Sequence, residues 1–209
     1  MQKQVKGFTL IELLIVIGII AILATVVILT LNPAELLRQS RDSTRFSDLS
    51  TVNSAIALYL SDVAAANIGL PLAGGSCYTS LPATPGFAGA TTTTCGARFP
   101  TGAATSNNGI YSKSARLVNG TGWLPINFEA ISTGSPLPNL PVDPVAPNTA
   151  GADLMSVIDD FYYAYAAGTN NTYEINTRIE SQKFASSSEN DGGNVLQLYE
   201  VGTNPGLAL

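Results

Sequence analysis

The sequence contains no histidine and few charged residues. None of the 209 residues is histidine, and aspartate, glutamate, lysine and arginine together make up only 12% of the chain. The absence of histidine excludes Ser-His and Cys-His catalytic sites and metal sites that depend on imidazole ligands. The sequence also lacks a phosphate-binding glycine loop and the HExxH arrangement of zinc peptidases. We therefore expect a protein that is not an enzyme and needs no cofactor.

Basic residues are outnumbered by acidic ones. The chain carries 10 basic and 15 acidic residues, which gives a net charge of -5. Proteins that bind nucleic acids generally present a basic field to the phosphates, and this composition offers none. We expect no sequence-specific contact with nucleic acid.

Cysteine is limited to Cys77 and Cys95. An even number of cysteines fits an oxidising compartment, so we predict a disulfide between these two residues. Such a bond would stabilise the fold by about 3 kcal/mol in the chain-entropy model. The alternative is a pair of free, buried thiols.

A long apolar run begins close to the N-terminus. Phe8 to Leu31 is a stretch of 24 residues with a single charge, Glu12. A helix of this length, rising ~1.5 Å per residue, spans the roughly 30 Å hydrocarbon core of a bilayer. The run is longer than the apolar region of an ordinary secretory signal and no A-x-A cleavage site follows it. We therefore expect the helix to stay on the mature protein.

Glu12 is the anomaly within this run. An acidic side chain costs about 2.5–3.5 kcal/mol at the centre of a membrane and less near an interface, so it usually has a partner. The alternative is that the residue lies in the first turns of the helix, where the helix dipole and headgroup water tolerate a negative charge.

The residues around Glu12 resemble a known signal. The segment from Lys6 to Leu13 reads KGFTLIEL, follows a short basic leader and continues into the apolar run. Leader, glycine, phenylalanine, glutamate position and apolar length together resemble the class III signal of type IV prepilins and pseudopilins. The match is close in the N-terminal part of the chain and extends to the remainder only in pattern.

The resemblance implies a processing and assembly pathway. A prepilin peptidase would cut between Gly7 and Phe8 on the cytoplasmic side, and the new amino group of Phe8 would be N-methylated. Glu12 would then pair with the Phe8 ammonium of a neighbouring subunit, because a hydrogen-bonded pair in low dielectric costs far less than a lone charge. The implied partners are further copies of the chain, the peptidase, a polytopic platform membrane protein and an assembly ATPase. The precursor would be a single-pass protein of the cytoplasmic (inner) membrane, and the processed subunit would join an extracellular or periplasmic filament.

The sequence divides into four expected segments. These are a leader (1–7), a transmembrane or filament-core helix (8–31), an amphipathic continuation of the same helix (32–65) and a globular head (66–209). In the continuation, apolar residues at spacings of 3 and 4 predict one face packed on the head: Leu49, Val52, Ile56, Tyr59 and Val63. Opposite charges at helical spacing predict a mostly solvated second face: Glu35 with Arg38, Arg38 with Asp42, and Arg45 with Asp48.

Two residues mark points where this helix could bend. Pro33 removes one helix hydrogen bond, and Gly18 is a second weak point. Flexibility there is an expectation from the family, and the alternative for Gly18 is close packing between helices in the membrane.

The head is expected to be a small sheet on the long helix. Residues 70–108 are rich in small and polar residues and predict a long connection with little regular structure. Strand patterns follow at 110–111, 115–118, 161–165, 172–180 and 195–201, with turns at 119–122 and 168–171. Alternation in the last two strands predicts one face on the helix and one face outward. We predict an α+β fold of pilin layout, with three or four antiparallel strands and with Trp123 as a core residue.

One proline-rich segment bears on metal binding. Leu137 to Pro144 is a rigid extended or turn segment, and it resembles the Leu-Pro-x-Asp-Pro element of major pseudopilins, with Val145 where a tryptophan often follows. In those pseudopilins calcium binds nearby, so calcium near Asp143 is kept as an alternative to the expectation of no metal. Carboxylates that suit a hard cation are also present elsewhere: Asp159, Asp160, Glu189 and Asp191.

The leading hypothesis for function is a type IV pilin that polymerises through its N-terminal helix. A close alternative is a pseudopilin of a type II secretion or DNA-uptake system, and the sequence does not separate the two. An alternative of another class is a membrane-anchored binding module, for example for carbohydrate, whose leader only looks like that of a pilin.

Overall fold

The computed structural model describes residues 7–69, 77–81, 98–99, 110–112, 114–145 and 161–206. The chain divides into two compact units, Met1–Arg38 and Gln39–Leu209, and each is considered by itself. The first unit contains helix α1 (Leu10–Leu31) and the start of helix α2 (Pro33–Asp62). The second unit contains the rest of α2, a five-stranded sheet and the short helices η1 (Phe128–Ala130), η2 (Thr169–Asn171) and α3 (Ala185–Glu189).

The predicted continuous helix is interrupted at Asn32, so that part of the prediction is wrong. Asn32 adopts φ 38° and ψ 74°, a left-handed conformation that ends α1. Pro33 is then the first residue of α2, where its fixed φ suits a helix start and its missing N–H costs nothing. The Asn32 side chain accepts a hydrogen bond from the Glu35 N–H at 3.4 Å and so caps α2. The helix therefore breaks at Asn32, one residue before Pro33, where the sequence predicts a bend.

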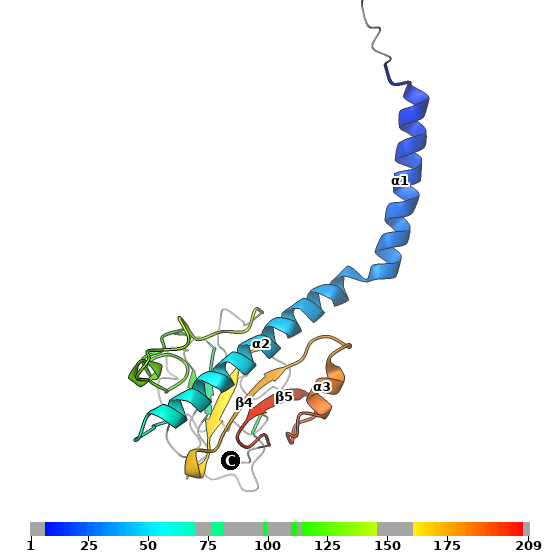
Figure 1. The fold of residues 1–209 in the computed structure, drawn as a ribbon. Coiled ribbons are helices and arrows are strands. Elements are labelled where there is room, and N and C mark those ends of the chain that lie inside the picture. The colour runs from blue at the N-terminus through cyan, green and yellow to red at the C-terminus, as the bar shows by residue number, and fades with distance from the viewer. Residues whose placement is uncertain are drawn as a thin grey trace, which may run out of the picture. The chain divides into compact units, whose positions relative to one another are not determined.

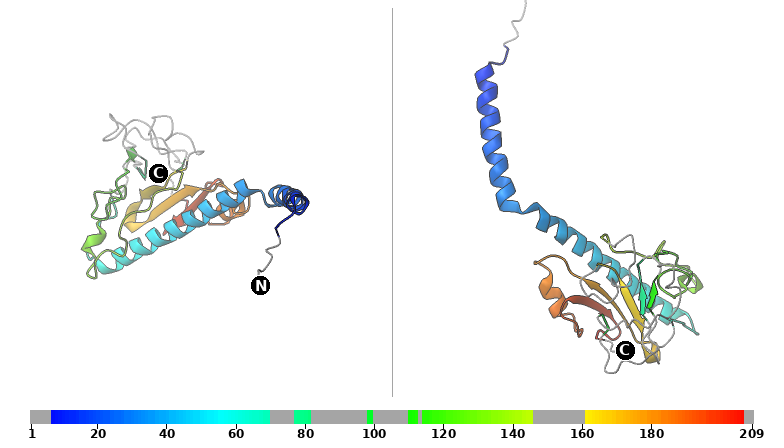
Figure 2. Two further views of the ribbon diagram at one scale, coloured as in Figure 1. Left: turned by 90° about the horizontal axis from the view of Figure 1, so that it is seen from above. Right: turned by 180° about the vertical axis from the view of Figure 1, so that it is seen from behind.

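Helix α2 packs one face on the sheet, as its apolar spacing predicts. Figure 1 shows α2 running across the strands, and Figure 2 shows helix and sheet as two layers. Buried side chains of α2 join the main core: Leu49, Val52, Ala55, Ile56 and Tyr59. The helix ends at Asp62, three residues before the predicted end, and the Asp62 carboxylate accepts hydrogen bonds from the Ser132 N–H at 2.6 Å and hydroxyl at 2.8 Å.

The sheet has the strand order β2-β1-β3-β4-β5. Four strands form an antiparallel ladder, and β2 adds to β1 in parallel. The strands are β1 (Cys77–Thr79), β2 (Ile110–Ser112), β3 (Ala164–Ala167), β4 (Tyr173–Arg178) and β5 (Leu198–Gly202). The α+β fold class and the β3–β4 hairpin are confirmed. Asn170 and Asn171 make the hairpin turn with φ of 59° and 58°, a left-handed conformation that asparagine tolerates.

Two strand predictions are wrong. Strand β1 lies within the stretch predicted to have little regular structure, and it was missed because three residues carry too short a pattern. Residues 115–118 form no strand; they are held instead by single hydrogen bonds, such as Trp123 N–H to the Ala115 carbonyl at 2.8 Å. Trp123 itself is buried in the main core, and its Nε1–H donates to the Pro141 carbonyl at 2.8 Å.

The face of the sheet opposite α2 is buried too, which corrects the prediction of an outward face. Tyr173 and Ile175 of β4 point to the α2 core, whereas Glu174 and Asn176 point the other way and are fully buried. A second apolar cluster covers that face: Cys77, Leu81, Phe99, Tyr162, Ala164 and Ala166. The alternation was read correctly, but a polar residue on the second face does not imply contact with water.

Candidate functional site

The predicted processing site lies just before α1. Gly7 and Phe8 precede the helix, and Phe8 is 85% exposed. Thr9 is the N-cap in an extended conformation, and Glu12 is the third residue of the helix. The structure brings Phe8 and Glu12 to the same end of α1. Cleavage between Gly7 and Phe8 stays a prediction.

Thr9 and Glu12 form a capping box. The Glu12 Oε2 atom accepts hydrogen bonds from the Thr9 N–H at 2.9 Å and from the Thr9 hydroxyl at 2.7 Å. In return the Glu12 N–H donates to the Thr9 Oγ1 at 3.3 Å. This arrangement satisfies backbone groups that every helix start leaves open. Within one chain Glu12 therefore lies in the first turn of the helix and has local hydrogen-bond partners, as the alternative interpretation of this residue expects. Its second carboxylate oxygen makes no hydrogen bond in the described part of the chain.

The surface of α1 is apolar on all sides. Leu13–Ile17 is a run of five large apolar residues, and successive residues on a helix point about 100° apart. Each of these five side chains is about half exposed. By length and composition Leu10–Ile28 can cross a membrane, and it is the one such helix among the residues that the structure describes. A helix that is apolar all round is stable only when lipid or other protein surrounds it.

Gly18 does not interrupt α1. The helix continues through it, and a methyl group added there would meet no atom within 4 Å. The backbone departs from helical geometry at Asn32 instead. Flexibility at Gly18 stays a prediction.

A buried arginine fastens α2 to the rest of the second unit. The Arg45 guanidinium binds Asp143 through two hydrogen bonds, Nε to Oδ2 at 2.7 Å and Nη2 to Oδ1 at 2.9 Å. Its Nη1 also donates to Asp42 at 2.7 Å and to Glu180 at 3.3 Å. We call these four residues the Arg45 cluster. The cluster joins α2 to the proline-rich segment and to the end of β4, so three distant parts of the chain meet at one cation.

Every charge of the Arg45 cluster has several partners. Asp42 accepts from the backbone N–H groups of Glu180 and Ser181, the latter at 2.7 Å. Burial opposes the charged form of Arg45, but its bonds to Asp143 and Asp42 raise its pKa above the ordinary value. The hydrogen bond from Arg41 lowers the pKa of Glu180. Both shifts favour the charged forms of Arg45 and Glu180.

The helical charge pairs predicted from spacing are right in one case and wrong in another. Glu35 and Arg38 do approach, at 3.7 Å. Arg45 does not pair with Asp48 on a solvated face, because its side chain is fully buried against Asp42 and Asp143. Asp48 instead accepts a hydrogen bond from the Tyr163 hydroxyl at 2.7 Å, and its burial raises its pKa. Sequence spacing identified the helix but not the direction of these side chains.

Asp143, the residue proposed near calcium, is committed to Arg45. Both of its carboxylate oxygens accept from the guanidinium, and Oδ1 also accepts from the Val145 N–H at 2.8 Å. A cation would have to displace Arg45 from this carboxylate. Asp159 and Asp160 lie outside the described residues. Among the described ones, no group of three or more cysteine or acidic side chains could hold a metal ion.

Of the two cysteines in the predicted disulfide, only Cys77 is among the residues that the structure describes. Cys77 is the first residue of β1 and is buried in the second apolar cluster. Cys95 lies outside the described residues. The Cys77–Cys95 bond stays a prediction.

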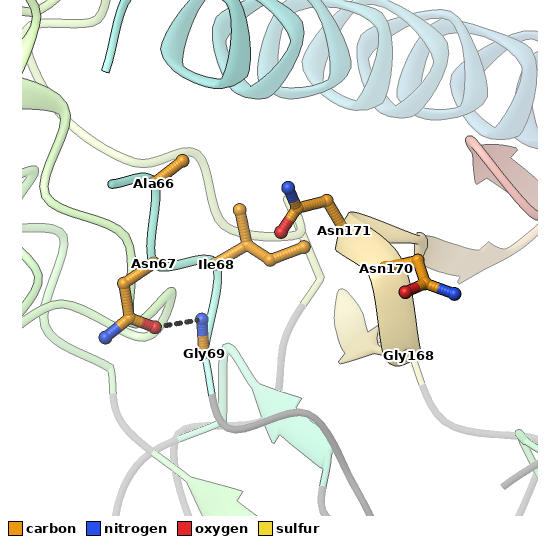
Figure 3. A pocket seen from close by; sticks show the side chains of 7 residues that line it. All are labelled: Ala66, Asn67, Ile68, Gly69, Gly168, Asn170 and Asn171. Atoms are coloured by element: carbon orange, nitrogen blue, oxygen red, sulfur yellow. Dashed lines mark hydrogen bonds between the residues drawn. The ribbon is translucent and has the colours of Figure 1, made fainter. Parts of the chain in front are cut away.

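A small hollow lies between the chain after α2 and the β3–β4 turn. It has a volume of about 200 Å³ and is lined by residues 66–69, which include the apolar side chains of Ala66 and Ile68, and by Gly168, Asn170 and Asn171. Figure 3 shows Asn67 turned back on its own segment, where its Oδ1 accepts from the Gly69 N–H at 3.0 Å. None of the described residues that line the hollow has an ionisable side chain, so these residues supply no acid or base for catalysis.

Comparison with known protein families supports the N-terminal signal. Residues 2–28 match the model described as the prokaryotic N-terminal methylation motif. This match covers the leader, Phe8, Glu12 and most of α1. We found no match among curated proteins and none among solved structures. The second unit is therefore interpreted from its own geometry.

Proposed function

Because the chain carries a prepilin signal of the type found in type IV pilins and pseudopilins, we propose that it is a structural subunit of a filament. Its N-terminal helix would hold the precursor in the membrane. After cleavage between Gly7 and Phe8, the same helix would polymerise with further copies into a type IV pilus-like filament. Prepilin peptidase, a platform membrane protein and an assembly ATPase are the partners that this process needs.

The surface of α1 is the observation that carries the proposal. Its large side chains are exposed on every side from Leu10 to Ile28. Burying such a side chain gains about 1.5–3 kcal/mol, so α1 must be enclosed both before and after assembly. A bilayer encloses it in the precursor, and other copies of α1 would enclose it in a filament. The same apolar surface of α1 would thus contact lipid in the precursor and other copies of α1 in the filament.

The second unit supports a structural role. Its core is closed by large apolar and aromatic side chains on one face of the sheet and by a second cluster on the other. The Arg45 cluster holds α2 against this core with bonds to two other segments. A rigid unit on a polymerising helix needs no reactive group, which agrees with the absence of histidine.

Replacing Gly7 tests the processing step. Gly7→Val places a branched side chain at the proposed scissile bond, so we expect the precursor to keep its leader and to be lost from the filament fraction. The measurement is the intact mass and N-terminal sequence of protein from membranes and from sheared surface material. The matched control is Gly18→Ala, whose added methyl meets no atom within 4 Å and which should be cleaved normally.

The wild-type result decides between the alternatives. A species beginning at N-methylated Phe8 in sheared material supports the pilin. The same species confined to membranes favours a pseudopilin. Normal cleavage of Gly7→Val, or a wild-type protein that keeps Met1, would overturn the prepilin interpretation, and a membrane-anchored binding module would then lead.

A further inference from the structure

The hollow beyond the C-terminal end of α2 has two walls from distant parts of the chain. One wall is the segment 66–69, and the other is the turn between β3 and β4, with Gly168, Asn170 and Asn171. Figure 3 shows the Asn171 carboxamide directed across the hollow toward the Ile68 side chain. The volume of about 200 Å³ leaves room for several water molecules. A small molecule can therefore occupy the hollow.

Two tyrosine hydroxyls hold the 66–69 wall in place. The Tyr59 hydroxyl accepts a hydrogen bond from the Asn67 N–H at 3.0 Å. The Tyr165 hydroxyl donates to the Ile68 carbonyl at 2.5 Å. Both tyrosines are buried in the main core, and Ile68 is itself only 4% exposed. This wall is therefore fixed before a ligand arrives, which lowers the entropy that binding costs.

The other wall holds two asparagine side chains in a left-handed turn. Asn170 and Asn171 have φ of 59° and 58°, where a side chain brings strain that a glycine would avoid. The Gly168 N–H donates to the Thr172 carbonyl at 2.7 Å and closes the turn. Both asparagines are exposed, and neither carboxamide makes a hydrogen bond within the described part of the chain. The turn thus presents polar groups that remain available to a ligand.

The chemistry of the lining favours a neutral ligand with hydroxyl groups. None of the described lining residues is ionisable, so these residues offer no charge to a phosphate, a carboxylate or an amine. A carboxamide has an oxygen that accepts and an NH₂ group that donates, and a hydroxyl group can pair with both. Ala66 and Ile68 add an apolar surface that suits C–H groups. A sugar ring combines hydroxyl groups at its edge with C–H groups on its faces.

We propose that the hollow is a binding site for one neutral sugar unit. The Asn171 carboxamide would bind hydroxyl groups at the edge of the ring, and a C–H face of the ring would lie on Ile68. Asn170, whose carboxamide points away from Ile68 in Figure 3, stands at the rim of the site. Binding here requires neither leader cleavage nor polymerisation. The site would add recognition of a glycan to a subunit whose proposed role is structural.

Binding of simple glycosides to the full-length chain tests the proposal. The probes are the methyl glycosides of glucose, galactose, mannose and N-acetylglucosamine, and the detergent is one without a sugar headgroup. NMR signals of the backbone amides at 67–69, 168, 170 and 171 should shift and saturate with at least one probe. We expect a dissociation constant on the order of 1 mM or lower.

Asn171→Gly removes the carboxamide that faces Ile68 and keeps the turn, because glycine adopts a positive φ without strain. It should weaken binding about tenfold, the effect of losing one or two hydrogen bonds to the ligand. The matched control is Asn32→Gly, the same change at the third left-handed asparagine of the described residues, which does not line the hollow. This control should bind with the wild-type affinity.

A second measurement needs no variant. Nuclear Overhauser effects between the Ile68 methyl groups and the ring protons of the bound probe should appear in the wild-type chain. The proposal is overturned if no probe shifts the amides of the two walls, if every probe shifts them equally and without saturation, or if Asn171→Gly binds as tightly as wild type. Because none of these measurements depends on processing or assembly, their failure is distinguishable from failure of the proposed function.

Discussion

Arg45→Met is expected to destabilise the second unit by about 3–5 kcal/mol, because it removes the cation from a buried cluster and leaves its carboxylates behind. Arg45 is fully buried and donates to Asp143 and Asp42, which are themselves fully or almost fully buried. Methionine can fill much of the space but donates no hydrogen bond. The two carboxylates would then remain in a dry site without their counter-charge, which costs more than the ion pair itself contributes.

The loss of stability can be measured by the fluorescence of Trp123, the only tryptophan in the sequence. Trp123 is buried in the main core, so its fluorescence reports unfolding of the full-length chain in detergent. We expect the midpoint of thermal unfolding to fall by on the order of 10 °C. Arg38→Met is the matched control, the same substitution on the same helix at a side chain that is 48% exposed. It should change stability by roughly 0.5 kcal/mol or less.

Arg45→Lys separates charge from geometry. Lysine keeps the positive charge but cannot donate the two parallel bonds to Asp143, so we expect an intermediate loss. If Arg45→Met and Arg38→Met have equal effects, the Arg45 cluster does not hold α2 to the sheet.

Glu12→Gln is expected to leave leader cleavage intact and to lower incorporation into filaments at least about tenfold. In the proposed filament Glu12 neutralises the ammonium of Phe8 from a neighbouring copy, and a coupling of roughly 1.4 kcal/mol already corresponds to that factor. Glutamine keeps an oxygen that accepts from Thr9, so the capping box survives while the charge is lost. The measurement is the ratio of processed subunit in sheared material to that in membranes.

Thr9→Val provides the opposite change. It removes the hydroxyl partner of Glu12 in the capping box and keeps the carboxylate charge. A lost N-cap costs about 1 kcal/mol of helix stability, so we expect nearly normal filament yield. Glu129→Gln, in the exposed part of η1, controls for loss of any carboxylate. If Thr9→Val blocks assembly and Glu12→Gln does not, helix capping rather than charge pairing is the role of Glu12.

The helices and the processing signal were predictable from the sequence because they depend on local patterns. The apolar run from Phe8 to Leu31 has the composition of a membrane helix whatever surrounds it. The spacing of Leu49, Val52, Ile56 and Tyr59 determined which face of α2 is buried. The break at Asn32 was placed one residue late, since a proline can also begin a helix and asparagine tolerates left-handed geometry.

The charged residues could not be placed by the same reasoning. Arg45 and Asp48 have ideal helical spacing for a surface pair, but each has its partner on another segment, at Asp143 and Tyr163. Glu174 and Asn176 alternate with apolar residues as on a half-exposed strand, yet the segment that contains Phe99 helps to bury their face. The spacing of residues along one helix or strand does not show which side chains of another segment will pack against them.

The sequence by itself determined the membrane-competent helix, the prepilin signal and the α+β class, because hydrophobic length, motif and periodicity are properties of contiguous residues. Only the tertiary structure decided that Arg45 is the cation that joins three segments and that Glu174 and Asn176 are buried on the second face of the sheet. Those groupings depend on contacts between residues up to 135 positions apart. Burial, which sets the energy of each of these charges, is a property of the folded chain as a whole.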